Sequence, residues 1–189
     1  MNEVIPCPLP IDAILVDKTL WRSLARHAEE AFPKEACALV VRGPAGPRLI
    51  LADNLAEGWH AADPETFPRT AMDSYILDPR LIVDAERGGE SLIAIIHSHC
   101  TVGAYFSAED LRLALTPDGR HPLFPGVSYV VLDAQEHGVR GWKTFVWSPD
   151  ARAFVESFCS TARRSECGVA PHGARAVEDH LTGATAPRS

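Results

Sequence analysis

The spacing of apolar residues along the chain alternates between a helical period and continuous apolar runs. Between Asp17 and Pro33, apolar side chains recur every three or four residues, which predicts an amphipathic helix capped by Asp17. A second helix is predicted in DPRLIVDAERGG, where Pro79 takes the first helical position and a glycine pair ends the helix. SAEDLRLAL predicts a short third helix, and PDARAFVESF predicts a last one.

Apolar runs elsewhere in the chain predict strands. EACALVV and RLILADNL flank a turn rich in glycine and proline, which predicts an antiparallel hairpin. SLIAIIHSH is a β-branched run with little alternation, typical of a strand buried on both faces. GVSYVVLDA and GVRGWKTFVWS predict two more strands, whereas the polar, proline-containing AEGWHAADPETFP predicts a loop. The pattern is that of a mixed α and β protein, with one sheet and helices packed on it.

Composition divides the chain near residue 160. Residues 1–159 carry the periodic apolar segments and are expected to form one domain. Residues 160–189 are rich in Ala, Gly, Ser, Thr and Arg and have few large apolar side chains, so we expect a flexible C-terminal tail.

Charge and cysteine content argue against several classes of function. A net charge of -7 disfavours sequence-independent binding to nucleic acid and docking on anionic membranes. No apolar run approaches the roughly 20 residues that span a bilayer, and the N-terminus lacks the pattern of a secretory signal, so we expect a cytoplasmic protein. The 5 cysteines form no C-x-x-C pair, which argues against a disulfide framework or a Cys-rich zinc site.

Candidate metal chemistry is concentrated at the end of the SLIAIIHSH strand. Residues two apart on a strand point to the same face, so His97 and His99 can aim two imidazoles at one point. Asp110 lies in the first turn of the helix that follows and is a candidate carboxylate ligand. Two histidines and one aspartate leave a fourth position open for water, which is the pattern of a catalytic zinc rather than a closed structural one.

The same residues also have an ordinary structural interpretation. SAED is close to the S-x-x-E capping box. In this interpretation Ser107 only caps the helix, and Asp110 only interacts favourably with the positive end of the helix dipole. Two histidines with this spacing also occur by chance on protein surfaces. The joint pattern, with a buried strand before it and a helix after it, is more specific than either part.

The stretch HSHCTVGAYFSAED resembles the metal motif of the JAMM/MPN+ metalloproteases, H-x-H, seven residues, then S-x-x-D. That family also places a glutamate upstream at the start of a strand, and PKEACALVVRG puts Glu35 at the matching position. The resemblance covers about residues 11–148 and is closest to the small bacterial branch that processes ubiquitin-like sulfur-carrier proteins. It implies an α/β fold of MPN/JAB-like (cytidine-deaminase-like) architecture, with a single curved mixed β-sheet flanked by helices.

A zinc hydrolase is the activity that this resemblance implies. Zn2+ would be held by His97, His99 and Asp110, with water in the fourth position. Glu35 would act as the general base that takes a proton from the water and passes it to the leaving amine. Ser107 would donate a hydrogen bond to the oxygen that becomes negative during the reaction.

The same resemblance implies a protein substrate. This would be a ubiquitin-like or sulfur-carrier protein with a Gly-Gly tail, cut at the amide or isopeptide bond after the second glycine. Such a tail can enter as an extended strand beside the edge of the sheet. Two alternatives are a non-catalytic MPN-type interaction module and a cell-wall or phage-tail-like peptidase of the same superfamily.

Cys100 departs from the family pattern, which usually has proline after the second histidine. Proline would stiffen the chain where it leaves the strand, and cysteine does not. The thiol has three interpretations: a small buried residue, an additional metal ligand, or a redox-sensitive group that pairs with a thiol such as Cys37.

Overall fold

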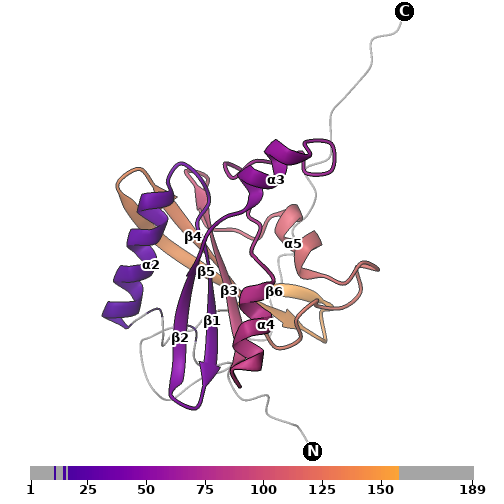
Figure 1. The fold of residues 1–189 in the computed structure, drawn as a ribbon. Helices are drawn as coiled ribbons and strands as arrows, with labels where there is room; N and C mark the ends of the chain where they lie inside the picture. Colours follow the sequence, from indigo (N-terminus) through magenta and orange to yellow (C-terminus); the bar gives the residue numbers. More distant parts are fainter. Residues whose placement is uncertain (1–10, 12–14, 16, 158–189) are drawn as a thin grey trace, which may run out of the picture.

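The computed structural model describes residues 11, 15 and 17–157 of the 189-residue chain. Its strands form one sheet in the order β2-β1-β3-β4-β5-β6, with helices on both faces (Figure 1). The strands are β1 (Cys37–Gly43), β2 (Gly46–Ala52), β3 (Ser91–Cys100), β4 (Ser128–Gln135), β5 (Gly138–Ser148) and β6 (Ala153–Ser157). The helices that lie wholly within the described residues are α2 (Lys18–Ala31), α3 (Ala56–Ala62), α4 (Arg80–Arg87) and α5 (Ala108–Ala114). The predicted mixed α/β architecture is confirmed, and the predicted tail at 160–189 lies outside the described residues.

Strand β3 lies inside the sheet and makes it a mixed one. It pairs antiparallel with β1 and parallel with β4, whereas the other neighbouring strands pair antiparallel. A parallel pair needs a crossover connection, and here the chain passes through α5 between β3 and β4. The crossover carries α5 back over the end of β3, where the candidate ligands lie.

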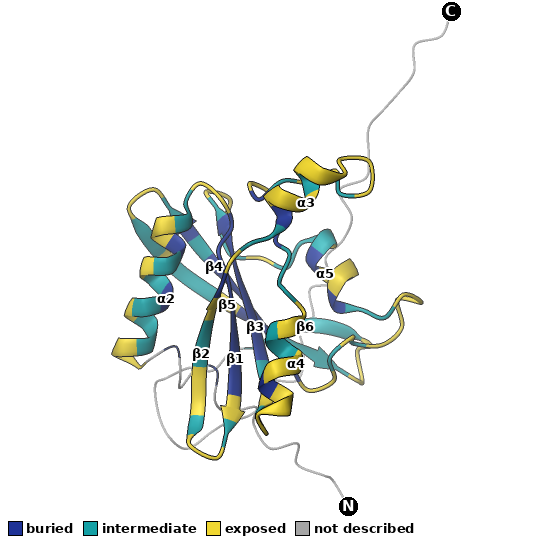
Figure 2. Ribbon diagram, in the orientation of Figure 1, coloured by how far each residue is buried: buried dark blue, intermediate teal, exposed yellow. Residues whose placement is uncertain are grey.

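Alternating side chains of the sheet build two hydrophobic cores, one on each face. Helix α2 covers one core, whose buried members include Leu24, Ala28, Ala38, Val40, Ile96 and Val130. Helices α4 and α5 cover the other, whose buried members include Leu39, Ile95, Ala114, Tyr129 and Val131. Figure 2 shows the central strands dark and the outer sides of the helices exposed. Apolar burial on both faces of β3 explains its continuous hydrophobic sequence.

The prediction of a helix in PDARAFVESF is wrong, because Ala153–Ser157 form strand β6. Arg152 adopts a left-handed conformation (φ 49) in the turn after β5, and the chain then pairs antiparallel with β5. The ring of Phe154 packs against Trp147 on its partner strand and against Tyr129 and Phe106 from the neighbouring core. Sheet pairing and these aromatic contacts override the helical preference of the isolated segment.

The loop predicted in AEGWHAADPETFP also needs correction, because its first half forms helix α3. The side-chain oxygen of Asn54 accepts a hydrogen bond from the backbone N–H of Ala56 at 3.0 Å, which satisfies a free donor at the start of the helix. Trp59 packs edge-on against Phe67, with 4.8 Å between ring centroids. A short polar helix with one packed aromatic carries little apolar periodicity, so its sequence resembles a loop.

The other predicted elements are confirmed. Asp17 caps α2 by accepting hydrogen bonds from the backbone N–H groups of Thr19 and Leu20, at 2.9 and 3.0 Å. The hairpin of β1 and β2 and the strands β3, β4 and β5 lie where the apolar runs placed them. Across the described part of the chain, no helix has the length and apolar character needed to cross a membrane.

Candidate metal centre

Strand β3 places two imidazoles on the same face of the sheet. His97 and His99 are 0% and 5% exposed, and their Nε2 atoms lie 3.3 Å apart. Ser98 points to the opposite face, as strand alternation predicts. His97 pairs with both β1 and β4, and His99 pairs with β4, so backbone pairing fixes the position of both histidines.

Helix α5 brings Asp110 against both imidazoles. One carboxylate oxygen of Asp110 lies 3.1 Å from His97 Nε2, and the other lies 3.3 Å from His99 Nε2. Tetrahedral zinc ligands at about 2.0–2.1 Å from the metal lie roughly 3.3 Å from one another. The three side chains form the one such cluster among the described residues, with ligand atoms within 4.8 Å of one another. Their donor types and spacing therefore fit zinc.

Burial and the neighbouring ligands both shift the pKa of each candidate ligand. Burial raises the pKa of Asp110, but hydrogen bonds from His97, His99 and Ser107 outweigh it and hold that pKa well below its usual range. Burial lowers the pKa of His97, which favours the neutral imidazole that binds metals. Burial also lowers the pKa of His99, but the hydrogen bond and charge of Asp110 outweigh it, and the net shift is upward.

Ser107 forms the complete capping box of α5. Its side chain accepts a hydrogen bond from the Asp110 backbone N–H at 3.1 Å, while its own backbone N–H donates to Asp110 Oδ2 at 2.8 Å. The Ser107 hydroxyl also donates to Asp110 Oδ2 at 2.7 Å. The structural interpretation of SAED is therefore correct, and it serves the metal interpretation as well, because the same cap orients the carboxylate toward the histidines.

Glu35 lies just before β1 and is 6% exposed. Burial raises its pKa from 4.5 to about 7, with a lowering contribution from His99 and a raising one from Asp110. Cys37, shortly after Glu35 in the chain, pairs with His97 across β1 and β3, so Glu35 enters the sheet beside the strand of the two histidines. A carboxyl group with a pKa near neutrality is well suited to take up and release a proton at neutral pH.

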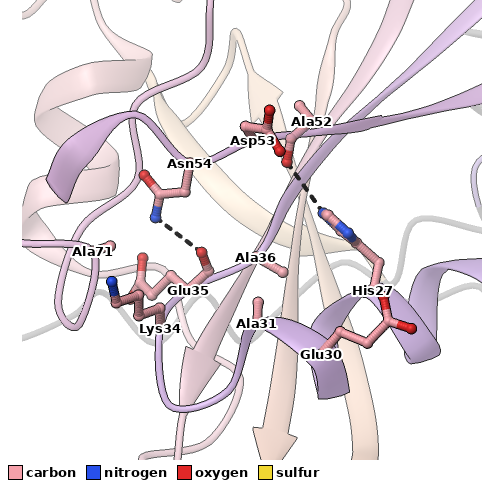
Figure 3. Close-up of a pocket in the computed structure, with 10 residues that line it drawn as sticks. All are labelled: His27, Glu30, Ala31, Lys34, Glu35, Ala36, Ala52, Asp53, Asn54 and Ala71. Atoms are coloured by element: carbon pink, nitrogen blue, oxygen red, sulfur yellow. Dashed lines mark hydrogen bonds between the residues drawn. The ribbon is translucent and has the colours of Figure 1, made fainter. Parts of the chain in front are cut away.

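A solvent-open hollow of about 370 Å³ lies beside Glu35, where the end of α2 approaches the end of β2 (Figure 3). Lys34, Asp53 and Asn54 line it together with Glu35. None of the three candidate ligands lines it. The hollow therefore borders the proposed base rather than the metal position.

Two tyrosines flank the imidazoles. The ring of Tyr75 stacks on His97, with 4.3 Å between centroids and 15° between planes. Tyr105 meets His99 edge-on at 4.7 Å and is 47% exposed. The sequence interpretation missed both, because neither belongs to the H-x-H or S-x-x-D pattern.

The Nδ1 atoms of both imidazoles are buried and have no hydrogen-bond partner among the described residues. The Gly103 backbone is near enough to His99 to help raise its pKa, but its geometry falls short of a hydrogen bond. Metal-binding histidines usually donate their second ring nitrogen to an acceptor. In this protein the His97 ring instead contacts the ring of Tyr75, and the His99 ring contacts the ring of Tyr105.

The structure excludes Cys100 as a metal ligand and excludes its pairing with Cys37. Cys37 pairs with His97 across β1 and β3 and shares its face of the sheet, whereas Cys100 packs with the core on the α2 side. The Cys100 thiol donates to the Lys34 carbonyl oxygen at 3.4 Å. A thiol on the far face is neither a metal ligand nor a disulfide partner of Cys37. Cys100 is a half-buried packing residue.

Comparisons with known proteins identify one matching family and two solved structures similar to this chain. A family model described as prokaryotic homologs of the JAB domain matches residues 17–145. A solution structure from Desulfitobacterium hafniense has a similar fold, with 24% sequence identity, a TM-score of 0.51, and coverage of 74% of this chain and 86% of that chain. A solution structure from Salinibacter ruber shares 20% identity over 79% of this chain and 87% of that chain, with a TM-score of 0.46.

No curated protein matches the chain. The family model nevertheless spans more than half of the sequence, and its range includes Glu35, the candidate ligands and Ser107. The chain therefore belongs to the family of prokaryotic homologs of the JAB domain.

Proposed function

We propose that the protein is a zinc-dependent hydrolase that cleaves an amide or isopeptide bond after the C-terminal Gly-Gly of a ubiquitin-like or sulfur-carrier protein. The observation that carries the proposal is the convergence of His97, His99 and Asp110 at zinc-ligand spacing. A buried glutamate with a raised pKa enters the sheet beside the strand of the two histidines. A non-catalytic interaction module would require neither feature.

His97, His99 and Asp110 would hold the zinc ion. Bound zinc would lower the pKa of a water molecule toward neutrality, which makes that water a source of nucleophilic hydroxide near neutral pH. Glu35 would accept a proton from that water and deliver it to the leaving amine. Glu35 is 6% exposed, and its raised pKa lets the carboxyl hold the proton near neutral pH between the two steps.

Ser107 has a second role in the proposal. Its hydroxyl group donates to Asp110 in this structure. To stabilise the substrate oxygen that becomes negative, it would have to turn away from Asp110 Oδ2 and donate to that oxygen instead. The backbone half of the capping box would still hold Asp110 during this rotation, because it does not use the hydroxyl proton.

The test uses the full-length, zinc-loaded protein and a sulfur-carrier protein whose Gly-Gly end is extended by a short peptide. We expect intact-mass analysis to show cleavage after the second glycine, and an Ala-Ala version of the substrate to remain uncut. Glu35→Gln should cleave at least about 100-fold more slowly with its zinc content unchanged. An uncut Gly-Gly fusion, or a Glu35→Gln variant as fast as wild type, contradicts the proposal, and cleavage of cell-wall peptides instead supports the peptidase alternative.

A further inference from the structure

Asn54, in the segment between β2 and α3, uses every hydrogen-bonding position of its side-chain amide. Its nitrogen donates to the carbonyl oxygens of Glu35 and Ser74, both at 2.9 Å. Its oxygen accepts from the backbone N–H groups of Ala56 and Ile76, at 3.0 and 3.1 Å. An asparagine amide has two donor hydrogens and two acceptor lone pairs, so none is left over. The four partners also fix which end of the amide is nitrogen.

The bonds of Asn54 reach the proposed base directly. Figure 3 shows the Asn54 side chain pointing at the carbonyl group of Glu35. The backbone N–H of Glu35 donates in turn to the Ala71 carbonyl oxygen at 2.7 Å. Glu35 is thus held at its nitrogen by the segment of residues 71–76 and at its oxygen by Asn54.

The same amide also reaches the metal ligands through an aromatic ring. Its bonds to Ser74 and Ile76 fix the backbone on both sides of Tyr75. The Tyr75 ring is 8% exposed and stacks on the fully buried imidazole of His97. His97 Nε2 faces Asp110 at 3.1 Å, whereas Nδ1 has no hydrogen-bond partner among the described residues, so stacking on Tyr75 is a second contact that limits rotation of the imidazole.

We propose that Asn54 is the positioning residue of the site. Its side-chain amide holds the backbone of Glu35 and the backbone on both sides of Tyr75, which keeps the Tyr75 ring stacked on His97. The base and the metal ligand are thereby set by a side chain that touches neither substrate nor metal. The inference rests on the metal site of the proposed function. It deepens that proposal by naming the residue that keeps the proposed base, Glu35, and the metal ligand His97 in fixed relative positions.

Two substitutions test the amide in different ways. Asn54→Asp retains the oxygen that accepts from Ala56 and Ile76 but loses both donated bonds, and Asn54→Ser removes the amide with all four of its bonds without adding charge. Asp17→Ala is the matched control, because it removes two hydrogen bonds at the start of α2, away from the site. Circular dichroism and thermal melting establish that each full-length variant is folded.

The first readout needs neither zinc nor substrate. In the zinc-free protein, the Tyr75 ring should shift the NMR signals of the His97 ring protons upfield, and Tyr75→Leu should abolish the shift. Folded Asn54→Asp and Asn54→Ser should lose most of it, while Asp17→Ala keeps it. Unchanged His97 signals in the folded Asn54 variants would overturn the inference and leave the proposed function intact.

The second readout is the affinity for Zn2+ alone, measured by competition with a chromogenic chelator. Loss of groups that orient metal ligands typically weakens affinity about 10–100-fold, and we expect this range for both Asn54 variants and for Tyr75→Leu. Tyr75→Phe should bind as wild type. Asn54→Ser combined with Tyr75→Leu should lose no more than either alone, since both act on one contact. Additive losses would overturn the coupling, whereas a wild-type protein that binds no zinc would overturn the metal site itself.

Discussion

The hydroxyl oxygen of Ser98 accepts a hydrogen bond from the backbone N–H of Ala36, with 2.8 Å between the two atoms. Ser98 stands between the two histidines in the sequence, and Ala36 directly follows Glu35. The backbone N–H of Ser98 also donates to the Ala36 carbonyl oxygen at 3.0 Å. This buried pair joins the strand of the metal ligands to the segment of the proposed base, 62 positions away along the chain.

Ser98→Ala is expected to lower the free energy of unfolding by about 1–3 kcal/mol, because it leaves the buried N–H of Ala36 without its acceptor. Urea denaturation at constant pH measures the loss. Ser91→Ala, at the exposed start of the same strand, is the control and should change stability by less than about 0.5 kcal/mol. Equal stability of Ser98→Ala and wild type would show that water or another group replaces the hydroxyl.

Zinc should stabilise the full-length protein through the three candidate ligands. We expect about one zinc ion per chain. Free zinc at about 100 times its dissociation constant should raise the free energy of unfolding by about 2.7 kcal/mol, because it binds the folded state. His97→Ala combined with His99→Ala should lose both the bound zinc and the zinc-dependent rise in melting temperature. His121→Ala, in an exposed loop, should behave as wild type, and retention of zinc by the double variant would contradict the assignment.

The stability of the zinc-free protein should fall as the pH rises through the titration range of Glu35. Burial raises the pKa of Glu35 from 4.5 to about 7, so between these values the folded state holds a proton that the unfolded chain has lost. The contribution of Glu35 to stability is therefore fully present below pH 4.5 and is lost, by up to about 3 kcal/mol, as the pH rises past 7.

Glu35→Gln should remove this dependence. The variant should match wild type near pH 4 and be more stable above pH 7, with both proteins kept in a chelator. Denaturation curves over the pH range provide the comparison. The same slope in both proteins would mean that another buried group is responsible.

Cys37 and Cys100 should react slowly with iodoacetamide at neutral pH in the folded protein. Burial raises the pKa of Cys37 to about 12 and that of Cys100 to about 11, so the reactive thiolate is scarce. Peptide mass spectrometry before and after unfolding in urea measures the protection. Peroxide should produce no Cys37–Cys100 disulfide, since the two thiols lie on opposite faces of the sheet. A linked peptide from folded protein would contradict that placement.

The sequence was most informative where periodicity and chemistry coincide. The continuous run before His97 predicted a buried strand, and the spacing of His97 and His99 predicted their shared face; both predictions are confirmed. Asp110 was expected in the first turn of a helix and lies there against both imidazoles. These features depend on local backbone geometry, which a short stretch of sequence specifies.

The rest depends on contacts between segments far apart in the chain. Asn54 has no motif around it, and its role appears only when four backbone groups from three segments converge on its amide. Tyr75 is one aromatic residue in a loop until the fold places it over His97. β6 likewise became a strand because an edge was available beside β5. No single-sequence pattern encodes such partners.

The crossover between β3 and β4 has a consequence for how the site can change over evolutionary time. All three candidate ligands lie within the short segment from His97 to Asp110, whereas Glu35 arrives from a separate hairpin. Bringing together ligands that are close in sequence costs little loop-closure entropy, and none of the three ligands belongs to the hairpin that carries Glu35. One substitution at Glu35 would then leave a folded, metal-binding protein with no base, and an ancestral enzyme of this architecture could become a pure binding protein in a single step.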